Sequence, residues 1–152
     1  MEFSILLLLI NAIATLYMTG LIWMVQIVHY PLFSEVGLEQ FPQYAQKHQF
    51  LTSIVVGPPM LTEALSAILL AWFLPPGTSL PMVIAGILLV ISIWASTAVI
   101  QVPCHEKLEE GFTATIHRRL VLTNWFRTVA WTARGFLVAW MLTLVINAIT
   151  VT

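Results

Sequence analysis

The four histidines of this chain are the residues whose positions most clearly predict chemistry. Each lies beside the end of a hydrophobic stretch, and all four fall at the same predicted edge of a membrane: His29, His48, His105 and His117. Imidazole nitrogens are common ligands of zinc, copper and iron. The clustering therefore predicts a shared site for one of these metals, with a haem held by two of the histidines as the alternative.

Glu63 is the one acidic residue inside a predicted membrane span, and a buried carboxylate requires a partner. One interpretation makes it a ligand of the same metal ion, or a proton acceptor in catalysis. A second pairs it with Arg134, or less readily with Arg127, in a buried ion pair. Burial would also permit a neutral, protonated Glu63. The preceding residues 57–59, Gly-Pro-Pro, are predicted to bend the helix or to end its first segment.

Other polar residues recur at helical spacing in the hydrophobic stretches, which predicts that they face the interior of a bundle. Some of them, namely Asn11, Thr15, Thr19 and Thr97, are best interpreted as hydrogen-bonding residues between helices. The predicted site contains others. Asn124 and Arg127 are expected to polarise a substrate oxygen, and Gln26, Gln101 and Arg134 are expected to contact a cofactor.

The elements that must position these residues are four hydrophobic helices. The chain has 152 residues, of which 59% are hydrophobic and 9% are charged, and its mean hydropathy is +0.92. Four stretches are long enough to cross the hydrocarbon of a bilayer: 3–28, 51–74, 81–102 and 122–150. We therefore expect an all-α, four-transmembrane-helix bundle that forms a single domain over residues 1–152. The net charge of −1 argues against a nucleic-acid partner.

The connections predict how the bundle lies in the membrane. Residues 75–77, Pro-Pro-Gly, form a tight turn, so the longer connections 30–50 and 104–121 must lie together at the other face, where they are expected to carry short amphipathic helices. Nearly all Lys and Arg residues lie in or beside them. The positive-inside rule then puts both connections in the cytoplasm and both termini outside, as expected for a bacterial inner-membrane protein. The lone Cys104 excludes an internal disulfide.

The two halves of the chain show a weak similarity. Gln26 precedes His29 at the end of the first stretch, and Gln101 precedes His105 at the end of the third. A polar connection with a second histidine follows in each half. The pattern indicates either two repeats related by an axis along the membrane normal or a coincidence between short polar linkers.

Three short motifs resemble small four-helix bacterial membrane proteins of the anthrone-oxygenase-like group. They are His-Tyr-Pro at 29–31, Gly-Pro-Pro-Met-Leu-Thr-Glu at 57–63 and Thr-Asn-Trp-Phe-Arg-Thr at 123–128. The resemblance implies oxygen chemistry on a hydrophobic substrate of an aromatic or polyketide-like type, with Asn124 and Arg127 in the site. It does not imply a role for the histidines in that chemistry.

Three classes of function are compatible with the sequence. The first is a metal- or haem-dependent membrane oxidoreductase that acts on a hydrophobic substrate at the cytoplasmic side. The second is a binding or transport protein for a small lipophilic or anionic molecule, in which Glu63 and Arg134 form a gated pair and a homodimer supplies further spans. The third is an accessory subunit of a larger complex, whose polar residues serve only packing.

Overall fold

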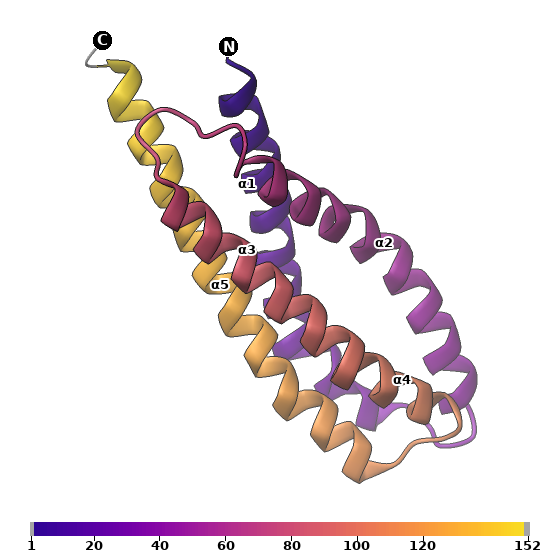
Figure 1. The fold of residues 1–152 in the computed structure, drawn as a ribbon. Helices are drawn as coiled ribbons and strands as arrows, with labels where there is room; N and C mark the ends of the chain where they lie inside the picture. The colour runs from indigo at the N-terminus through magenta and orange to yellow at the C-terminus, as the bar shows by residue number, and fades with distance from the viewer. Residues whose placement is uncertain (1, 151–152) are drawn as a thin grey trace.

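A computed structural model describes residues 2–150 as a bundle of long helices, and no strand occurs in this range (Figure 1). The elements in chain order are α1 (Phe3–Met24), η1 (Val25–His29), η2 (Pro31–Glu35), α2 (Phe41–Leu69), α3 (Leu80–Ser96), η3 (Thr97–Gln101), α4 (Val102–Glu109) and α5 (Ala114–Thr150). These elements form four helical segments long and apolar enough to cross a membrane. The predicted all-α four-helix bundle is confirmed.

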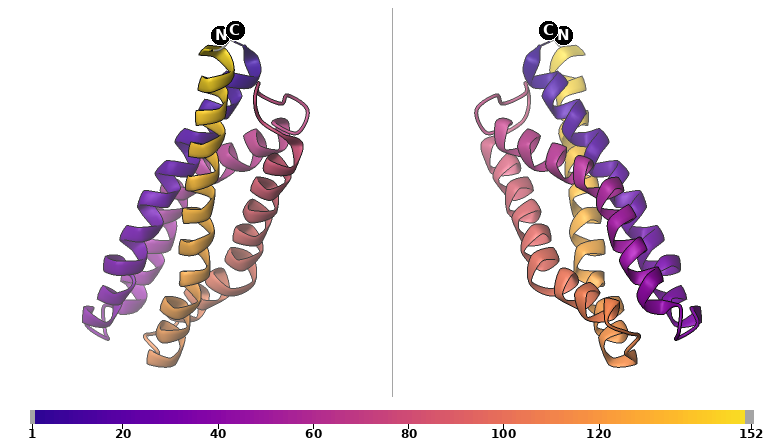
Figure 2. Two further views of the ribbon diagram at one scale, coloured as in Figure 1. Left: turned by 90° about the vertical axis from the view of Figure 1, so that its left-hand side faces the viewer. Right: turned by 90° about the vertical axis from the view of Figure 1, so that its right-hand side faces the viewer.

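The helices run alternately up and down, so the two termini lie at one end together with the α2–α3 turn (Figure 2). The two longer connections lie at the opposite end. α1 packs mainly against α2 and α5, and α5 also packs against α3. Many large hydrophobic side chains point outward and stay exposed, for example Ile13, Trp72 and Phe136. These exposed faces are consistent with an integral membrane protein whose helices contact lipid.

The helices extend further into the connections than the hydrophobic pattern predicts. α2 begins at Phe41 rather than near Leu51, and α5 begins at Ala114 rather than near Leu122. The amphipathic segments are therefore extra turns of the spanning helices. Their inner faces are covered in a core cluster that includes Phe33 and Leu108, and such tertiary packing stabilises turns that hydropathy alone does not predict.

The two prolines of α2 bend the helix without ending it. Pro58 and Pro59 lie inside one continuous helix, so the predicted alternative of an ended segment is wrong. Neither proline has an N–H to donate to the preceding turn, and each ring crowds a carbonyl there. Figure 2 shows the two halves of α2 running in different directions. The bend separates the half that carries His48 from the half that carries Glu63.

The first and the third spanning segments each contain a widened, π-helical turn before a proline. η1 is followed by Pro31, with the Tyr30 N–H donating to the Val25 carbonyl at 2.9 Å. η3 is followed by Pro103, with the Val102 N–H donating to the Thr97 carbonyl. Single π-turns inside α-helices frequently occur at functional sites. Their paired occurrence agrees with the weak similarity between the two halves of the sequence.

The widened turn η1 keeps the buried residues of the first spanning segment on the face that points into the bundle. Met18, Ile22, Gln26 and Tyr30 are all buried, and they follow one another at steps of four. An α-helix advances about 100° per residue, so each such step overshoots a full turn by about 40°. A regular helix would therefore carry Tyr30 out of the bundle. The extra residue in η1 offsets this drift.

Gly77 in the α2–α3 turn is expected to resist substitution. Its φ is +75°, and a Cβ at this position would lie 2.7 Å from the backbone oxygen of Leu144. We expect Gly77→Ala to lower the free energy of unfolding by about 1–3 kcal/mol. Titration with denaturing detergent would measure the loss. Gly20→Ala is the matched control, because nothing lies within 4 Å of its Cβ. Equal stability of the two variants would contradict the prediction.

Candidate functional site

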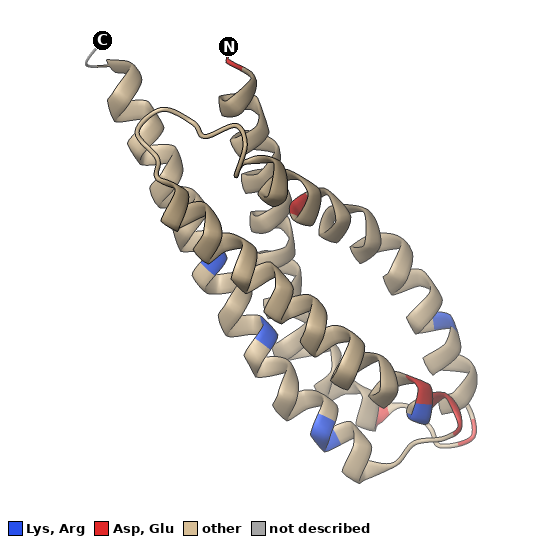
Figure 3. Ribbon diagram, viewed as in Figure 1, with Lys and Arg blue, Asp and Glu red and all other residues tan. Residues whose placement is uncertain are grey.

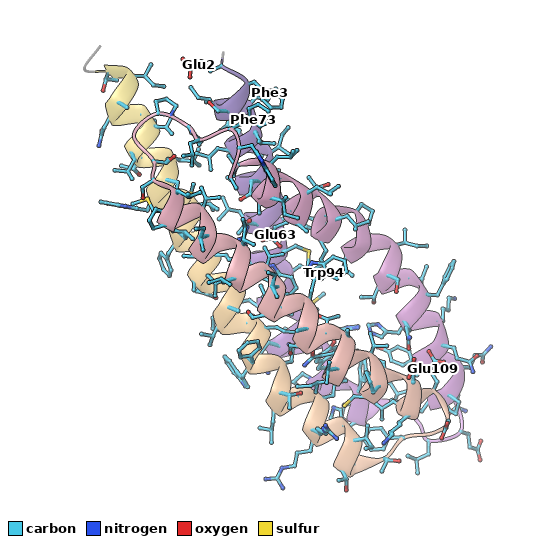
Figure 4. All side chains as sticks on the ribbon, in the orientation of Figure 1. Glu2, Phe3, Glu63, Phe73, Trp94 and Glu109 are labelled. Atoms are coloured by element: carbon cyan, nitrogen blue, oxygen red, sulfur yellow. The ribbon has the colours of Figure 1, made fainter. Side chains whose placement is uncertain are left out.

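The first of two polar clusters lies in the middle of the bundle and is centred on Glu63 and Arg134. Arg134 Nε donates to Glu63 Oε1 at 2.7 Å, and both side chains are 1% exposed. Thr15 Oγ1 also donates to Oε1, at 2.8 Å, and Trp131 Nε1 donates to Oε2, at 3.0 Å. Figure 4 shows Glu63 well inside the bundle, away from Glu109 at the connection end. Both carboxylate oxygens are therefore hydrogen-bonded.

The other two nitrogens of Arg134 also donate hydrogen bonds. Nη1 donates to the Gly86 carbonyl, and Nη2 donates to Asn11 Oδ1 at 3.3 Å and to Thr15 Oγ1 at 3.2 Å. Of the interpretations of Glu63, the structure shows the ion pair with Arg134. The cluster joins α1, α2, α3 and α5. Such a saturated network stabilises one arrangement of the helices.

The second polar cluster lies at the connection end and contains the histidines. His29 Nε2 and His48 Nδ1 are 2.9 Å apart, and Thr52 Oγ1 is 3.1 Å from the same His48 nitrogen. The Tyr30 hydroxyl is 2.9 Å from His105 Nε2. The rings of His48 and His105 are neighbours, with centroids 5.5 Å apart. Three of the four predicted histidines are thus brought together, and Tyr30 joins them.

His117 serves a different purpose from the other three. Its Nε2 lies 2.7 Å from the backbone oxygen of Tyr30, and its ring stacks on Phe33 with centroids 6.2 Å apart. It therefore connects α5 to the segment that follows α1. Bonding of Nε2 to a carbonyl oxygen requires a proton on that nitrogen, so only Nδ1 of this ring could ligate a metal in this arrangement.

The histidine cluster does not have the arrangement of a metal site in the described part of the chain. No group of three or more His, Cys, Asp or Glu side chains within residues 2–150 is arranged to hold a metal ion. Glu63 lies fifteen residues beyond His48 on α2, about 22 Å along a helix, so the structure does not bring it to the histidines. The predicted metal or haem stays a prediction without support from this geometry.

A cavity of about 480 Å³ lies against the histidine cluster. Its polar end is lined by His29, Tyr30, Tyr44, Lys47, His48, Gln101, His105 and Arg127. Its apolar end is formed by side chains nearer the middle of the bundle, including Met18, Ile22 and Val56. The lining on α2 runs from Tyr44 to Val56, about 18 Å of helix. The volume falls in the range of small-molecule pockets.

The cavity is open to the outer surface of the bundle, because several side chains that line it are exposed. They come from α1, α2 and α4, with exposed fractions of 51% for Met24, 49% for Leu51, 46% for Val55 and 38% for Val102. All four are hydrophobic. Because the surrounding surface is apolar along the spanning helices, the opening faces the region where lipid chains lie.

Arg127 is the buried cation of the cavity. Its side chain is 7% exposed, and its guanidinium lies 5.1 Å from the centroid of the Trp131 ring. Its charge also lies close enough to Tyr30 for an electrostatic interaction. Nε has no hydrogen-bond partner among the described residues. A buried guanidinium remains charged, and the Arg127 side chain is one of those that line the cavity.

The other predicted site residues mostly connect helices. Asn124 Nδ2 donates to Gln26 Oε1 at 2.9 Å, and Thr128 Oγ1 donates to the same oxygen at 3.4 Å. Gln101 Nε2 lies 3.4 Å from Thr123 Oγ1. Gln26 and Asn124 do not line the cavity, whereas Gln101 does. Arg134 lies in the Glu63 cluster, away from the histidines.

The cavity residues that were not predicted as site residues include Tyr30, Tyr44 and Lys47. Tyr30 directly follows His29, and Tyr44 precedes His48 by one helical turn. Their positions beside the two histidines were the available signal. The use of Tyr44 and Lys47 in the cavity follows from the extension of α2 to Phe41, which the hydropathy pattern does not reveal.

Comparisons of this chain with protein families, with curated proteins and with solved structures found no match. The resemblance to the anthrone-oxygenase-like group therefore stays an expectation from three short motifs. The function has to be inferred from the geometry of the cavity and the side chains that line it.

Proposed function

We propose that this protein binds a small amphipathic molecule that enters its cavity sideways from the bilayer. The supporting observation is a cavity with an apolar end among Met18, Ile22 and Val56 and a polar end among the histidines. The apolar body of the ligand would lie toward the middle of the bundle. Its polar head would lie beside Tyr30, His48 and His105, which supply hydrogen-bonding groups for orientation and specificity.

The histidine pair would give this site a proton donor and acceptor. Two neutral imidazoles joined by one hydrogen bond share a single proton between their facing nitrogens. In His48 that bond uses Nδ1, so Nε2 is left for a ligand group. This arrangement favours a site that orients the polar head of a ligand by hydrogen bonds, and it supports binding more directly than metal-dependent oxidation.

The basic residues support an orientation for the binding site. Figure 3 shows Lys and Arg at the connection end of the bundle and along α5, with none beside the termini. In our proposal the connections face the cytoplasm of a bacterial cell and the ligand head lies near the inner leaflet. The exposed pair Arg118 and Arg119 would contact lipid phosphates there.

The proposal is tested by photolabelling in lipid nanodiscs with a diazirine derivative of dodecanol. We expect the label on the cavity segments 44–56 and 97–105. Val56→Trp fills the apolar end and is expected to reduce this labelling about tenfold, because the ligand body loses its space. Peptide mass spectrometry would locate and quantify the adducts.

Ile54→Trp is the matched control. Ile54 lies on the same helix, is 57% exposed and does not line the cavity. It is expected to leave labelling of the cavity segments unchanged. Adducts spread evenly over all lipid-facing helices, or equal labelling of both tryptophan variants, would overturn the proposal.

A further inference from the structure

Two arginines of α5 lie on the same face of the helix but differ in how they are satisfied. Arg127 and Arg134 are seven residues apart, about two helical turns. Every nitrogen of Arg134 donates a hydrogen bond, and Glu63 balances its charge. Arg127 is nearly as well buried, yet its Nε has no partner among the described residues. The contrast indicates that a partner of Arg127 comes from outside residues 2–150.

The charges around the cavity define what that partner must be. The charged side chains of the lining are the cations Lys47 and Arg127, and no Asp or Glu of the described chain lines it. Among residues 2–150 the one ion pair is that of Glu63 with Arg134. Trp131 and Tyr30, which contact Arg127, are uncharged. Burial of a guanidinium without an anion is unfavourable, and far more so in an apolar surrounding.

We infer that Arg127 binds the anionic head of the ligand, and that the head is a carboxylate or a similar planar oxyanion. This inference rests on the proposed function and adds the chemical class of the ligand. A guanidinium presents its N–H groups in a fixed fork that matches two carboxylate oxygens. Tyr30 would position the fork, and the neighbouring His105 would donate to the same head. A site of this kind would bind an amphipathic acid more tightly than the matching alcohol.

The test compares diazirine derivatives of dodecanoic acid and dodecanol in the same nanodiscs, at alkaline pH. We expect the acid to label the cavity segments about tenfold more efficiently than the alcohol, because it gains a charge-assisted hydrogen bond. In Arg127→Met this ratio is expected to fall to about one. Arg127→Lys is expected to keep part of the preference, since it retains a charge without the fork.

The ratio is measured within one protein, so partial loss of folding affects both ligands alike. If Arg127→Met fails to fold, the ratio in Arg127→Lys decides, and an unreduced ratio there overturns the inference. A ratio near one in the unaltered protein overturns it while leaving the cavity proposal intact. Lys47→Met is the matched control, and if it alone abolishes the preference, Lys47 rather than Arg127 binds the head. Absence of cavity labelling by either ligand would instead overturn the proposed function.

Discussion

Replacement of Glu63 by Gln is expected to lower the free energy of unfolding by about 3–5 kcal/mol. The substitution preserves the shape of the side chain but leaves the Arg134 charge uncompensated in a position that is 1% exposed. The bonds to Thr15 and Trp131 would be weakened as well, because an amide oxygen is a poorer acceptor than a carboxylate. Unfolding by titration with denaturing detergent, followed by circular dichroism, would measure the change.

Two further variants separate loss of the ion pair from a general effect. Glu106→Gln removes an exposed carboxylate and is expected to change stability by less than about 0.5 kcal/mol. The double variant Glu63→Gln, Arg134→Met removes both charges and is expected to be more stable than Glu63→Gln alone. The loss of stability in the double variant is compared with the sum of the losses in Glu63→Gln and in Arg134→Met. Equality of the two values would show that the pair is not coupled, which would contradict the geometry.

Gln26→Leu is expected to cost about 2–3 kcal/mol, because it leaves buried polar groups of α5 without partners. Gln26 accepts from Asn124 and Thr128 and donates to the Val121 carbonyl at 3.2 Å. Asn124→Leu is expected to cost less, because Asn124 Oδ1 already has no partner among the described residues. The same detergent titration would rank the two variants.

Gln46→Leu provides the control for Gln26→Leu. Gln46 lies in the exposed part of α2, so its loss leaves no buried group unpaired. The double variant Gln26→Leu, Asn124→Leu is expected to recover part of the loss, since both partners are then apolar. A larger cost for Asn124→Leu than for Gln26→Leu would contradict the assigned bonding.

The spans were predictable because the thickness of a bilayer imposes a length on every apolar helix, whatever its neighbours. The ion pair could be named only as one interpretation. Glu63 and Arg134 are on different helices, and whether they meet depends on how α2 and α5 cross, which no local pattern determines. The mid-bundle bonding of Asn11 and Thr15 matched the prediction, because a polar group in an apolar helix must face a partner.

The site was harder to predict because it depends on ring orientation and on the path of one helix. Four histidines fall at one edge of the predicted bundle, yet the ring of His117 bonds a backbone carbonyl and that of His105 bonds Tyr30. Glu63 was predicted to join the same site, although its distance from His48 along α2 separates them. The cavity depends on side chains of four helical segments, and the hydropathy pattern does not predict the distances between these segments.

The widened turns η1 and η3 make the place of a deletion as important as its length. A widened turn holds one residue more than a regular α-helical turn, so deleting one residue within Val25–His29 would let it close to a regular turn. The residues beyond it would then keep nearly their present directions. Deleting one residue from the regular part of α1 would instead rotate everything beyond it by about 100° around the helix axis. An alignment of related chains should therefore accept a one-residue gap at η1 and treat the same gap within α1 as a change of the face that carries Tyr30.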